Sequence, residues 1–428
     1  MNAFPGRRMK RNSTRSITPA AIIKTEPACI RRVQGSRVGR QARRQNQFQL
    51  AKKLRHRQPF KHAADAGGDL QEKGMSCNRS QKRRRSKHLT RNESHASCSR
   101  NSPRISLITG GAGFIGSHVA DGLLEAGERV IVLDDLSTGS KSNLSKWRGC
   151  GRLEFVEGSV LDERLVRDLV SRCDRVFHLA AAVGVGLVVK QPMRSLETNV
   201  IGSFNVIRAC VQKKRPLLVT SSSEVYGKSN VLPFREDADI MLGPSECPRW
   251  SYACSKAIAE FYAQSCAASS SSRTVIVRLF NTCGPRQTGR YGMVVPRFVA
   301  QGLAGKPITV YGTGNQIRCF AHVLDIAEGI ISLMDCGRAW GRTVNLGSDR
   351  PVTINRLAET VKRLTGGRSE IVRVPFQTVY GDHFEDMEAR QPDLSVARAL
   401  IDYRPVRTLE EIIRDVIAHM KPHFAPEA

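Results

Sequence analysis

The segment ISLITGGAGFIGSHVADGLLEAGERVIVLD, residues 105–134, decides the fold. It opens and closes with short apolar runs typical of buried strands, and a helix-length stretch lies between them. Gly110, Gly113 and Gly116 stand at GxxGxxG spacing where the first strand is expected to end and the helix to begin. A strand, a glycine-rich turn, a helix and a second strand in this order predict the first βαβ unit of a parallel sheet.

The glycine-rich turn has the composition of a phosphate-binding turn. Its first glycine permits the tight turn, the second lets the backbone approach a pyrophosphate, and the third lets the helix pack against the strand. Asp134 ends the second expected strand. Its carboxylate can accept hydrogen bonds from ribose hydroxyls and would repel a 2′-phosphate. The segment therefore predicts NAD binding, in preference to NADP, and an ordinary βα turn with an exposed aspartate is the structural alternative.

The same alternation continues along the chain. Val/Ile/Leu-rich runs recur as LEFVEG, RVFHLA, PLLVTS and TVIVRLF, with helices expected over 114–126, 162–171, 192–213 and 251–267. Buried parallel strands have this composition, and alternating strands and helices form doubly wound sheets. The fold class is therefore predicted to be α/β, a Rossmann-type doubly wound parallel sheet, with an NAD-binding domain over 103–283.

The first hundred residues differ in composition from the rest. They hold 26 of the 67 basic and 5 of the 39 acidic residues, a balance of +21 within the chain's net charge of +28. Without apolar periodicity they predict a disordered basic tail over 1–102. Such a tail can be an arm that contacts polyanions. It can equally be a solvated extension, an organelle transit peptide, or sequence upstream of a true start at Met75 or later.

No apolar run in the sequence is long enough for a membrane span or a secretory signal. The 12 cysteines show no paired CxxC spacing. These observations predict a soluble, cytoplasmic protein with reduced thiols and without a metal site.

A catalytic constellation is expected at the end of the fifth strand. Tyr252 and Lys256 are four residues apart on an expected helix, so both project from one face. An ammonium beside a phenol favours phenolate, as would the positive charge of an oxidised nicotinamide, and both lower the tyrosine pKa toward working pH. Tyr252 is therefore a candidate general base. Ser222, at the carboxyl end of the strand, is the candidate to orient the reacting oxygen; a surface tyrosine and a solvated lysine are the structural alternative.

Seven motifs in order, TGGAGFIGSH, VLDDLSTG, HLAA, ETNVIGS, SSSEVYG, YACSK and RLFNTCGPRQ, resemble the extended short-chain dehydrogenases of the NAD-dependent epimerase/dehydratase group, which modify nucleotide sugars. The similarity runs from about Ile105 to the end. It implies tightly held NAD, a nucleoside diphosphate sugar as substrate, a homodimer, and a smaller, mainly substrate-binding domain over 284–428 interleaved with late Rossmann elements. The implied cofactor residues are Gly110, Gly113, Phe114, Ile115, Gly116, Asp134, Asn199, Tyr252 and Lys256; the implied substrate residues are Asn281, Arg290, Arg318, Arg390 and Asp393.

The resemblance leaves the reaction open. All branches share a 4-keto sugar intermediate. Ser222, Ser223 and Glu224, followed by VYG, and the QIRCF segment with Arg318 resemble UDP-glucuronate decarboxylases, in which the 4-ketone is β to the C6 carboxylate. Glu224 is then a candidate proton donor or positioning group; a structural role is the alternative. The other hypotheses are a UDP-glucose 4-epimerase, a 4,6-dehydratase, whose extra Asp is absent here, and a non-catalytic NAD-binding scaffold.

Three further features belong to the substrate side of this hypothesis. Arg390 and Asp393, at RxxD spacing, resemble a pair that holds the nucleotide ribose and phosphate. Arg286, Arg290 and Arg297 can form a basic rim for a diphosphate or a solvated face. Relatives commonly have Asp where this chain has Ser159, so an adenine contact is in doubt there.

Overall fold

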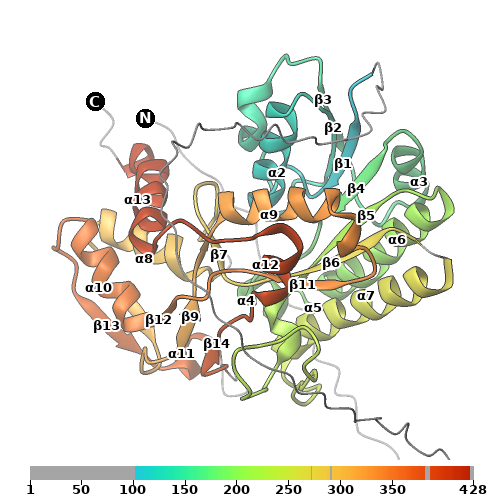
Figure 1. Ribbon diagram of the computed structural model, residues 1–428. Helices are drawn as coiled ribbons and strands as arrows, with labels where there is room; N and C mark the ends of the chain where they lie inside the picture. The colour runs from blue at the N-terminus through green and yellow to red at the C-terminus, as the bar shows by residue number, and fades with distance from the viewer. Residues whose placement is uncertain (1–101, 271, 290–291, 381–385, 425–428) are drawn as a thin grey trace, which may run out of the picture. The chain divides into compact units, whose positions relative to one another are not determined.

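A seven-stranded parallel sheet organises the described part of the chain (Figure 1). The computed structural model describes residues 102–270, 272–289, 292–380 and 386–424. The predictions for the basic tail and its contacts with polyanions therefore lie outside the described residues. In spatial order the strands are β11 (Thr343–Leu346), β6 (Thr274–Leu279), β5 (Leu217–Ser222), β4 (Arg175–His178), β1 (Ile105–Thr109), β2 (Arg129–Asp134) and β3 (Leu153–Glu157).

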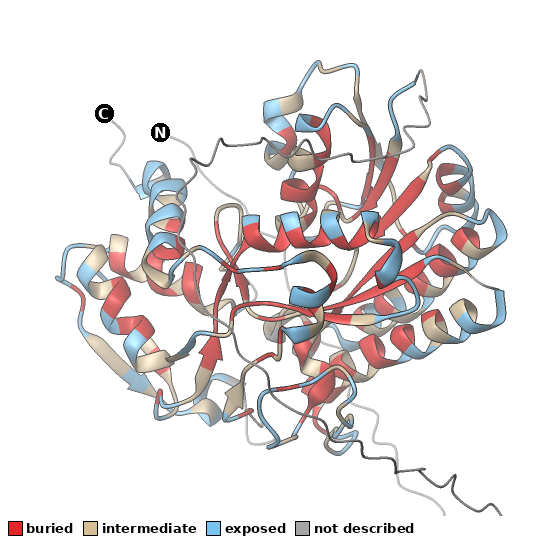
Figure 2. Cartoon of the chain, in the orientation of Figure 1, coloured by how far each residue is buried: buried red, intermediate tan, exposed pale blue. Residues whose placement is uncertain are grey.

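The predicted fold class is confirmed. Each of the six apolar runs forms a strand, and the order from β3 through β2, β1, β4 and β5 to β6 is that of a dinucleotide-binding sheet. The runs are continuously apolar because helices cover both faces of the sheet. One buried cluster joins the sheet to α2 (Phe114–Glu125), α9 (Val323–Asp335) and α12 (Ser395–Ile401). The other joins it to α3 (Glu163–Ser171), α6 (Ser203–Gln212) and α7 (Pro248–Ser270), with red strands between the layers in Figure 2.

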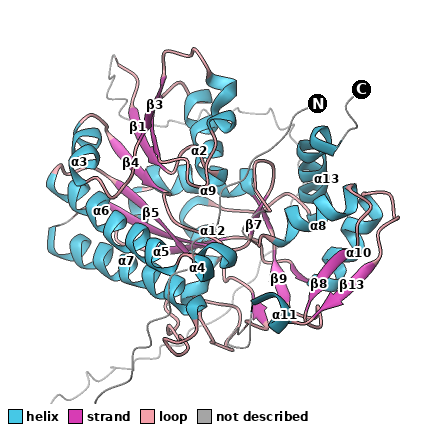
Figure 3. Ribbon diagram, turned by 180° about the vertical axis from the view of Figure 1, so that it is seen from behind, coloured by secondary structure: helices cyan, strands magenta, loops and turns pink. Residues whose placement is uncertain are grey.

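The helix expected over 192–213 is the one that differs most from prediction. It divides into α5 (Pro192–Leu196), a π-helical segment η2 (Glu197–Gly202) and α6. The apolar pattern alone does not distinguish these, because a π-segment adds one residue per turn without a composition of its own. The other three expected helices are confirmed as α2, α3 and α7, and Figure 3 shows α3, α6 and α7 together on one side of the sheet.

The C-terminal part contributes β11, α9 and α12 to the large sheet and its covering layer, and most of its other elements pack around a separate core. That core includes Phe298, Ile308, Leu357 and Ile413. The small sheets are β10–β7, β12–β9–β14 and β13–β8. The remaining elements are α4 (Val185–Lys190), α8 (Val294–Leu303), α10 (Ile354–Leu364), α11 (Phe376–Tyr380), α13 (Leu409–Met420), β7 (Thr282–Cys283), β8 (Ile308–Tyr311), β9 (Ile317–Cys319), β10 (Ala321–His322), β12 (Pro351–Thr353), β13 (Ile371–Val374), β14 (Ala389–Arg390) and the 3₁₀ turns η1 (Lys141–Trp147), η3 (Ser223–Tyr226), η4 (Gly337–Ala339) and η5 (Lys421–Phe424).

Two further observations concern the described residues as a whole. None of their helices combines the length and the apolar character that crossing a bilayer requires. Their cysteines are free thiols, and Cys173, Cys210, Cys247, Cys283 and Cys319 are buried.

Candidate active site

The glycine-rich turn leaves no room for side chains at two of its three positions. Gly110 has a positive φ of 73°, and a Cβ there would lie 2.7 Å from the Ala180 nitrogen. A Cβ on Gly116 would lie 2.2 Å from the Gly110 carbonyl oxygen. At Gly113, where α2 begins, a Cβ would lie 3.1 Å from that same oxygen, so the contact is milder. The turn therefore presents bare backbone and a helix N-terminus to the cleft beside it.

Asp134 supports this turn from the end of β2. Its Oδ2 accepts a hydrogen bond from the Ala112 amide at 3.0 Å, and its Oδ1 accepts one from the Leu136 amide at 2.9 Å. Burial raises the pKa of the Asp134 carboxyl, and these two bonds oppose the shift. The carboxylate lines the cleft with 7% exposure, so it both holds the turn and faces the space next to it.

The Ser222, Tyr252 and Lys256 side chains meet where β5 ends beside α7. Ser222 is the last residue of β5 and shares a side-chain hydrogen bond with the half-buried Tyr252. The Lys256 Nζ donates to the Thr220 carbonyl at 2.9 Å. Burial lowers the pKa of Lys256 to about 8, against a smaller opposing effect of Glu260. The sequence pattern thus correctly placed all three residues together on the wall of one cleft.

The expectation that Lys256 lowers the pKa of Tyr252 is wrong for the protein's own groups. Burial raises the pKa of Tyr252 well above its usual range, and the hydrogen bond with Ser222 only partly opposes this. Lys256 is not among the groups that shift it, because its Nζ is directed to the Thr220 carbonyl. The sequence suggested two positive charges that would favour the phenolate form of Tyr252, those of Lys256 and of an oxidised nicotinamide. Of these two, the charge of the nicotinamide remains.

Asn199 lies behind the wall of the cleft. Its Oδ1 accepts from the Ala182 amide at 2.8 Å, and its Nδ2 donates to the Ala182 carbonyl and to the Ser255 hydroxyl. The side chain is fully buried. Asn199 therefore ties the loop after β4 to α7, which supports the cleft from outside.

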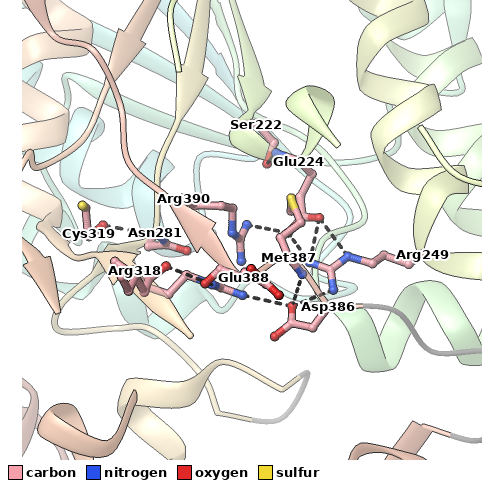
Figure 4. A network of polar contacts seen from close by, with 11 residues as sticks. Ser222, Glu224, Arg249, Asn281, Arg318, Cys319, Asp386, Met387, Glu388 and Arg390 are labelled. Atoms are coloured by element: carbon pink, nitrogen blue, oxygen red, sulfur yellow. Dashed lines mark hydrogen bonds and ion pairs between the residues drawn. The ribbon is translucent and has the colours of Figure 1, made fainter. Parts of the chain in front are cut away.

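A network of three arginines and two carboxylates forms the part of the cleft next to Ser222 (Figure 4). At its centre, Glu224 Oε1 accepts from Arg390 Nη1 at 2.5 Å, and Glu224 Oε2 accepts from Arg249 Nε and Nη2 at 3.2 Å each. Asp386 Oδ1 accepts from Arg249 Nη1 and from Arg318 Nη2, both at 2.9 Å. Each of these two carboxylates is therefore shared by two guanidinium groups.

Glu224 is held as a carboxylate. Burial alone would raise its pKa, but Arg390, Arg249 and Arg318 outweigh that effect and lower the pKa to about 2. A group with this pKa carries no proton at neutral pH, so the structure favours the positioning role of Glu224 over the proton-donor role that the sequence also suggested. Its observed geometry is that of a shared counter-ion which fixes the positions of Arg390 and Arg249.

The positive charge of Arg318 is destabilised by two neighbouring arginines. Burial, followed by the fields of Arg390 and Arg249, lowers its pKa to about 10, although Asp386 and Glu224 act in the opposite direction. Its Nη1 donates to the Ile317 and Glu388 carbonyls. Arg318 therefore lies among like charges although its guanidinium group is closely bonded.

The other predicted substrate residues are distributed as follows. Asn281 lines the cleft with a positive φ of 22°, and its Nδ2 donates to the Cys319 carbonyl at 3.4 Å. Arg390 lines the cleft, whereas Asp393 does not and accepts a hydrogen bond from the Ser395 amide at 2.7 Å, so the structure brings only Arg390 of this predicted pair to the cleft. Arg290 lies outside the described residues. Arg286 lines the cleft and pairs with Asp121 at 2.8 Å.

The cleft that joins these groups has a volume of about 890 Å³, enough for a dinucleotide and a further ligand. The profile of the NAD dependent epimerase/dehydratase family matches residues 106–347. The chain belongs to this family.

Comparisons with individual proteins agree with this family assignment. A UDP-N-acetyl-alpha-D-glucosaminuronate decarboxylase of Bacillus cytotoxicus is 37% identical over 312 residues, covering 73% of this chain and 96% of the relative. A UDP-glucuronic acid decarboxylase 1 of Danio rerio is 34% identical, and the match covers 75% of this chain and 74% of that relative. The crystal structure of a UDP-glucose 4-epimerase from Thermotoga maritima superimposes with a TM-score of 0.67 at 30% identity, covering 75% of this chain and all of that one.

NAD is the cofactor of this family, and the residues of the turn fit it. The glycines expose backbone where side chains would obstruct a pyrophosphate, and the N-terminus of α2 favours an anion. Phe114 and Ile115, in the first turn of α2, line the same cleft.

Sequence reasoning missed Arg249 and Asp386. A signal was present for Arg249, since it lies in the first turn of α7, where the helix dipole disfavours a cation unless a carboxylate compensates. Asp386 had no local signal, because it lies outside every regular element and meets Arg249 and Arg318 only through the tertiary fold.

Proposed function

We propose that this family member decarboxylates a UDP-hexuronate, with UDP-glucuronate as substrate and UDP-xylose as product. The observation that carries the proposal is the buried Nε of Arg390, which has no hydrogen-bond partner among the described residues and lies in the network with Arg249 and Arg318. The fields of Glu224 and Arg390 reach the Tyr252 hydroxyl, so the network lies next to the reacting position. A sugar carboxylate would accept a charge-assisted hydrogen bond from Arg390, whereas the hydroxymethyl group of a neutral hexose would accept only a weaker one.

The first half of the reaction is an oxidation at C4 of the sugar. Tyr252 takes the proton of the C4 hydroxyl, Ser222 orients that oxygen, and Lys256 holds the end of β5 through Thr220. NAD, when bound, would supply the hydride acceptor for C4 and the donor that restores it. Gly110, Gly113, Phe114, Ile115, Gly116 and Asp134 are proposed to hold it, with Asn199 as a positioning residue.

The second half is loss of the carboxylate. Once C4 is a ketone, the electrons of the C5–C6 bond pass toward the C4 oxygen as an enolate, and C6 leaves as carbon dioxide. C5 then takes a proton that originates in solvent, and C4 is reduced again. Arg390 is suited to the carboxylate because its buried Nε has no hydrogen-bond partner among the described residues. Glu224 positions Arg390 for this contact.

The diphosphate is assigned to the other side of the cleft. Arg286 Nη1 is buried without a hydrogen-bond partner in the described chain. With Asn281, and with Arg318 at the edge of the network, it would face the substrate's phosphates or sugar. In this proposal residues 103–283 serve mainly the cofactor, and residues 284–428 serve mainly the nucleotide sugar.

A second substrate has specific support. The Bacillus cytotoxicus relative, whose length is 96% covered, is named for UDP-N-acetylglucosaminuronate. Both compounds are UDP-hexuronates and make the same demand on the network, because they differ at C2 and not at C6. The Thermotoga maritima structure supports 4-epimerisation as the competing reaction.

We also propose a homodimer in a cytoplasmic setting. Met193, Ile201, Ile258 and Phe261 are apolar and exposed on α5, η2 and α7, which contact one another. Because a twofold interface places the same face on both subunits, a second copy would cover them. Phe261→Asp should then give monomers in light scattering, while a parent protein that is itself monomeric would contradict the dimer.

The deciding experiment incubates the full chain with UDP-glucuronate, UDP-N-acetylglucosaminuronate or UDP-glucose and follows products by proton NMR with trapping of carbon dioxide. Carbon dioxide and UDP-xylose from UDP-glucuronate, without net consumption of NAD, are expected. Conversion of UDP-glucose to UDP-galactose with no carbon dioxide from either uronate would replace the proposal with 4-epimerisation.

A further inference from the structure

Asp386 is a carboxylate of the network for which neither the motifs nor the family match provides a role. It lies just before β14, lines the cleft and has a side chain 20% exposed. Its Oδ1 accepts three hydrogen bonds, from Arg249 Nη1, Arg318 Nη2 and the Met387 amide, each at 2.9 Å. Its Oδ2 accepts none within the described part of the chain. Asp386 therefore binds two guanidinium groups through a single oxygen atom.

We infer that Asp386 is a specificity-determining residue that limits how tightly the arginines hold the substrate's carboxylate. The inference rests on the proposed decarboxylation. Without Asp386 the network would lose one negative charge, and a sugar carboxylate would be attracted by Arg318 in addition to Arg390. With Asp386 in place, part of the Arg318 charge is already compensated before a substrate binds.

This limit matters because decarboxylation removes the charge that the arginines bind. As the C5–C6 bond breaks, negative charge moves from the C6 carboxylate to the C4 oxygen. A cation that binds the carboxylate strongly stabilises the ground state more than the transition state, which slows the chemical step. Asp386 thus exchanges tight binding of the substrate for faster loss of carbon dioxide.

The geometry of Asp386 provides a mild variant. In Asp386→Asn the remaining oxygen can keep all three hydrogen bonds of Oδ1, and the new amide takes the place of Oδ2. Only the charge is lost. Glu388→Gln is a matched control. Glu388 lies two residues after Asp386, its side chain is exposed, and the substitution likewise removes one negative charge. Asp386→Glu, which keeps the charge, provides the rescue variant.

Two measurements test the inference on the full chain. Steady-state release of carbon dioxide from UDP-glucuronate gives kcat and KM. Calorimetry in a Tyr252→Phe background gives the Kd of UDP-glucuronate, UDP-glucose and UDP without turnover. For Asp386→Asn we expect KM and Kd for UDP-glucuronate about tenfold lower, kcat about tenfold lower, and Kd for UDP-glucose and UDP within twofold of the parent. Glu388→Gln and Asp386→Glu should stay near the parent.

Other outcomes overturn the inference. Equal tightening of UDP-glucuronate, UDP-glucose and UDP would mean that Arg249 and Arg318 face the diphosphate. Unchanged constants would mean that the Asp386 charge has no role in binding. If Asp386→Asn does not fold, Asp386→Glu tests the inference instead. The inference requires the parental kcat and KM in Asp386→Glu, whereas a lower kcat together with a higher KM would assign Asp386 a structural role. Absence of carbon dioxide from the parent protein would instead refute the proposed function.

Discussion

Arg390 and Glu224 lie 166 positions apart in the sequence, yet their Nη1 and Oε1 atoms are 2.5 Å apart in the cleft. The contact ties the segment after β5 to β14. One ion pair therefore joins the region proposed to bind mainly the cofactor to the region proposed to bind mainly the nucleotide sugar. Because Glu224 also binds Arg249, the loss of this one carboxylate would remove a counter-ion from two guanidinium groups.

Glu224→Gln keeps the size and the acceptor oxygen of the side chain but removes its charge. We expect kcat/KM for UDP-glucuronate to fall about tenfold, because Arg390 loses its counter-ion and its fixed position. The pH–rate profile of the parent protein should show no limb from Glu224 between pH 4 and 8, since its pKa is about 2. An acidic limb in the parent that disappears in Glu224→Gln would restore the proton-donor role.

Glu224 also predicts how stability depends on pH. Its folded-state pKa of about 2 lies below the ordinary value of 4.5, so its contribution is fully present above pH 4.5 and is lost as the pH falls toward 2. Urea unfolding at pH 5.5, 4, 3 and 2 should show the parent more stable than Glu224→Gln at pH 5.5, with the difference shrinking steadily. A difference that stays constant over this range would contradict the assigned pKa.

Tyr252→Phe should retain NAD and lose turnover. The phenol is the proposed base, and a positioned base contributes about 10²- to 10⁴-fold. Release of carbon dioxide measures the loss, and chromatography of the denatured protein measures bound NAD. Tyr262→Phe is the control, because it removes a hydroxyl from the same helix where the ring stacks on Phe204. Turnover of Tyr252→Phe within tenfold of the parent would remove Tyr252 from the mechanism.

Asp134→Ala should narrow the preference for NAD over NADP and also weaken binding of both. The first effect follows from loss of the negative charge near the 2′ position, and the second from loss of the bonds to the Ala112 and Leu136 amides. Fluorescence titration of both cofactors measures this. Equal affinity of the parent for NAD and NADP would show that the carboxylate does not face the ribose.

Gly116→Ala tests the close packing of the turn. The new Cβ would lie 2.2 Å from the Gly110 carbonyl, and the shift needed to relieve that clash should cost about 1–3 kcal/mol and weaken NAD binding. Gly151→Ala is the control, because a Cβ there meets nothing within 4 Å. Thermal unfolding with and without NAD measures both effects. If the two variants behave alike, close packing at Gly116 is not what the turn requires.

Much of the fold was predictable because it depends on local patterns. The six strand runs and the turn at Gly110 carry their information within a few residues, and Tyr252 and Lys256 are placed by helical spacing alone. The network was not predictable in the same way. Arg249 precedes the helix expected over 251–267, and Arg318 was implied only as a substrate residue, whereas their shared partner, Asp386, is joined to them only by folding. Ionisation of Glu224 depends on all three arginines and could not be inferred before they were placed.

The positions of these residues along the chain have a consequence for biosynthesis. The proposed cofactor residues all lie between Gly110 and Lys256, but the charge network is complete only with Arg390. A ribosome reaches the first set well before the second. The emerging polypeptide therefore acquires every proposed NAD contact while the network that would choose its sugar is still unfinished, and a chain interrupted before residue 386 would keep those cofactor residues without the means to select a substrate.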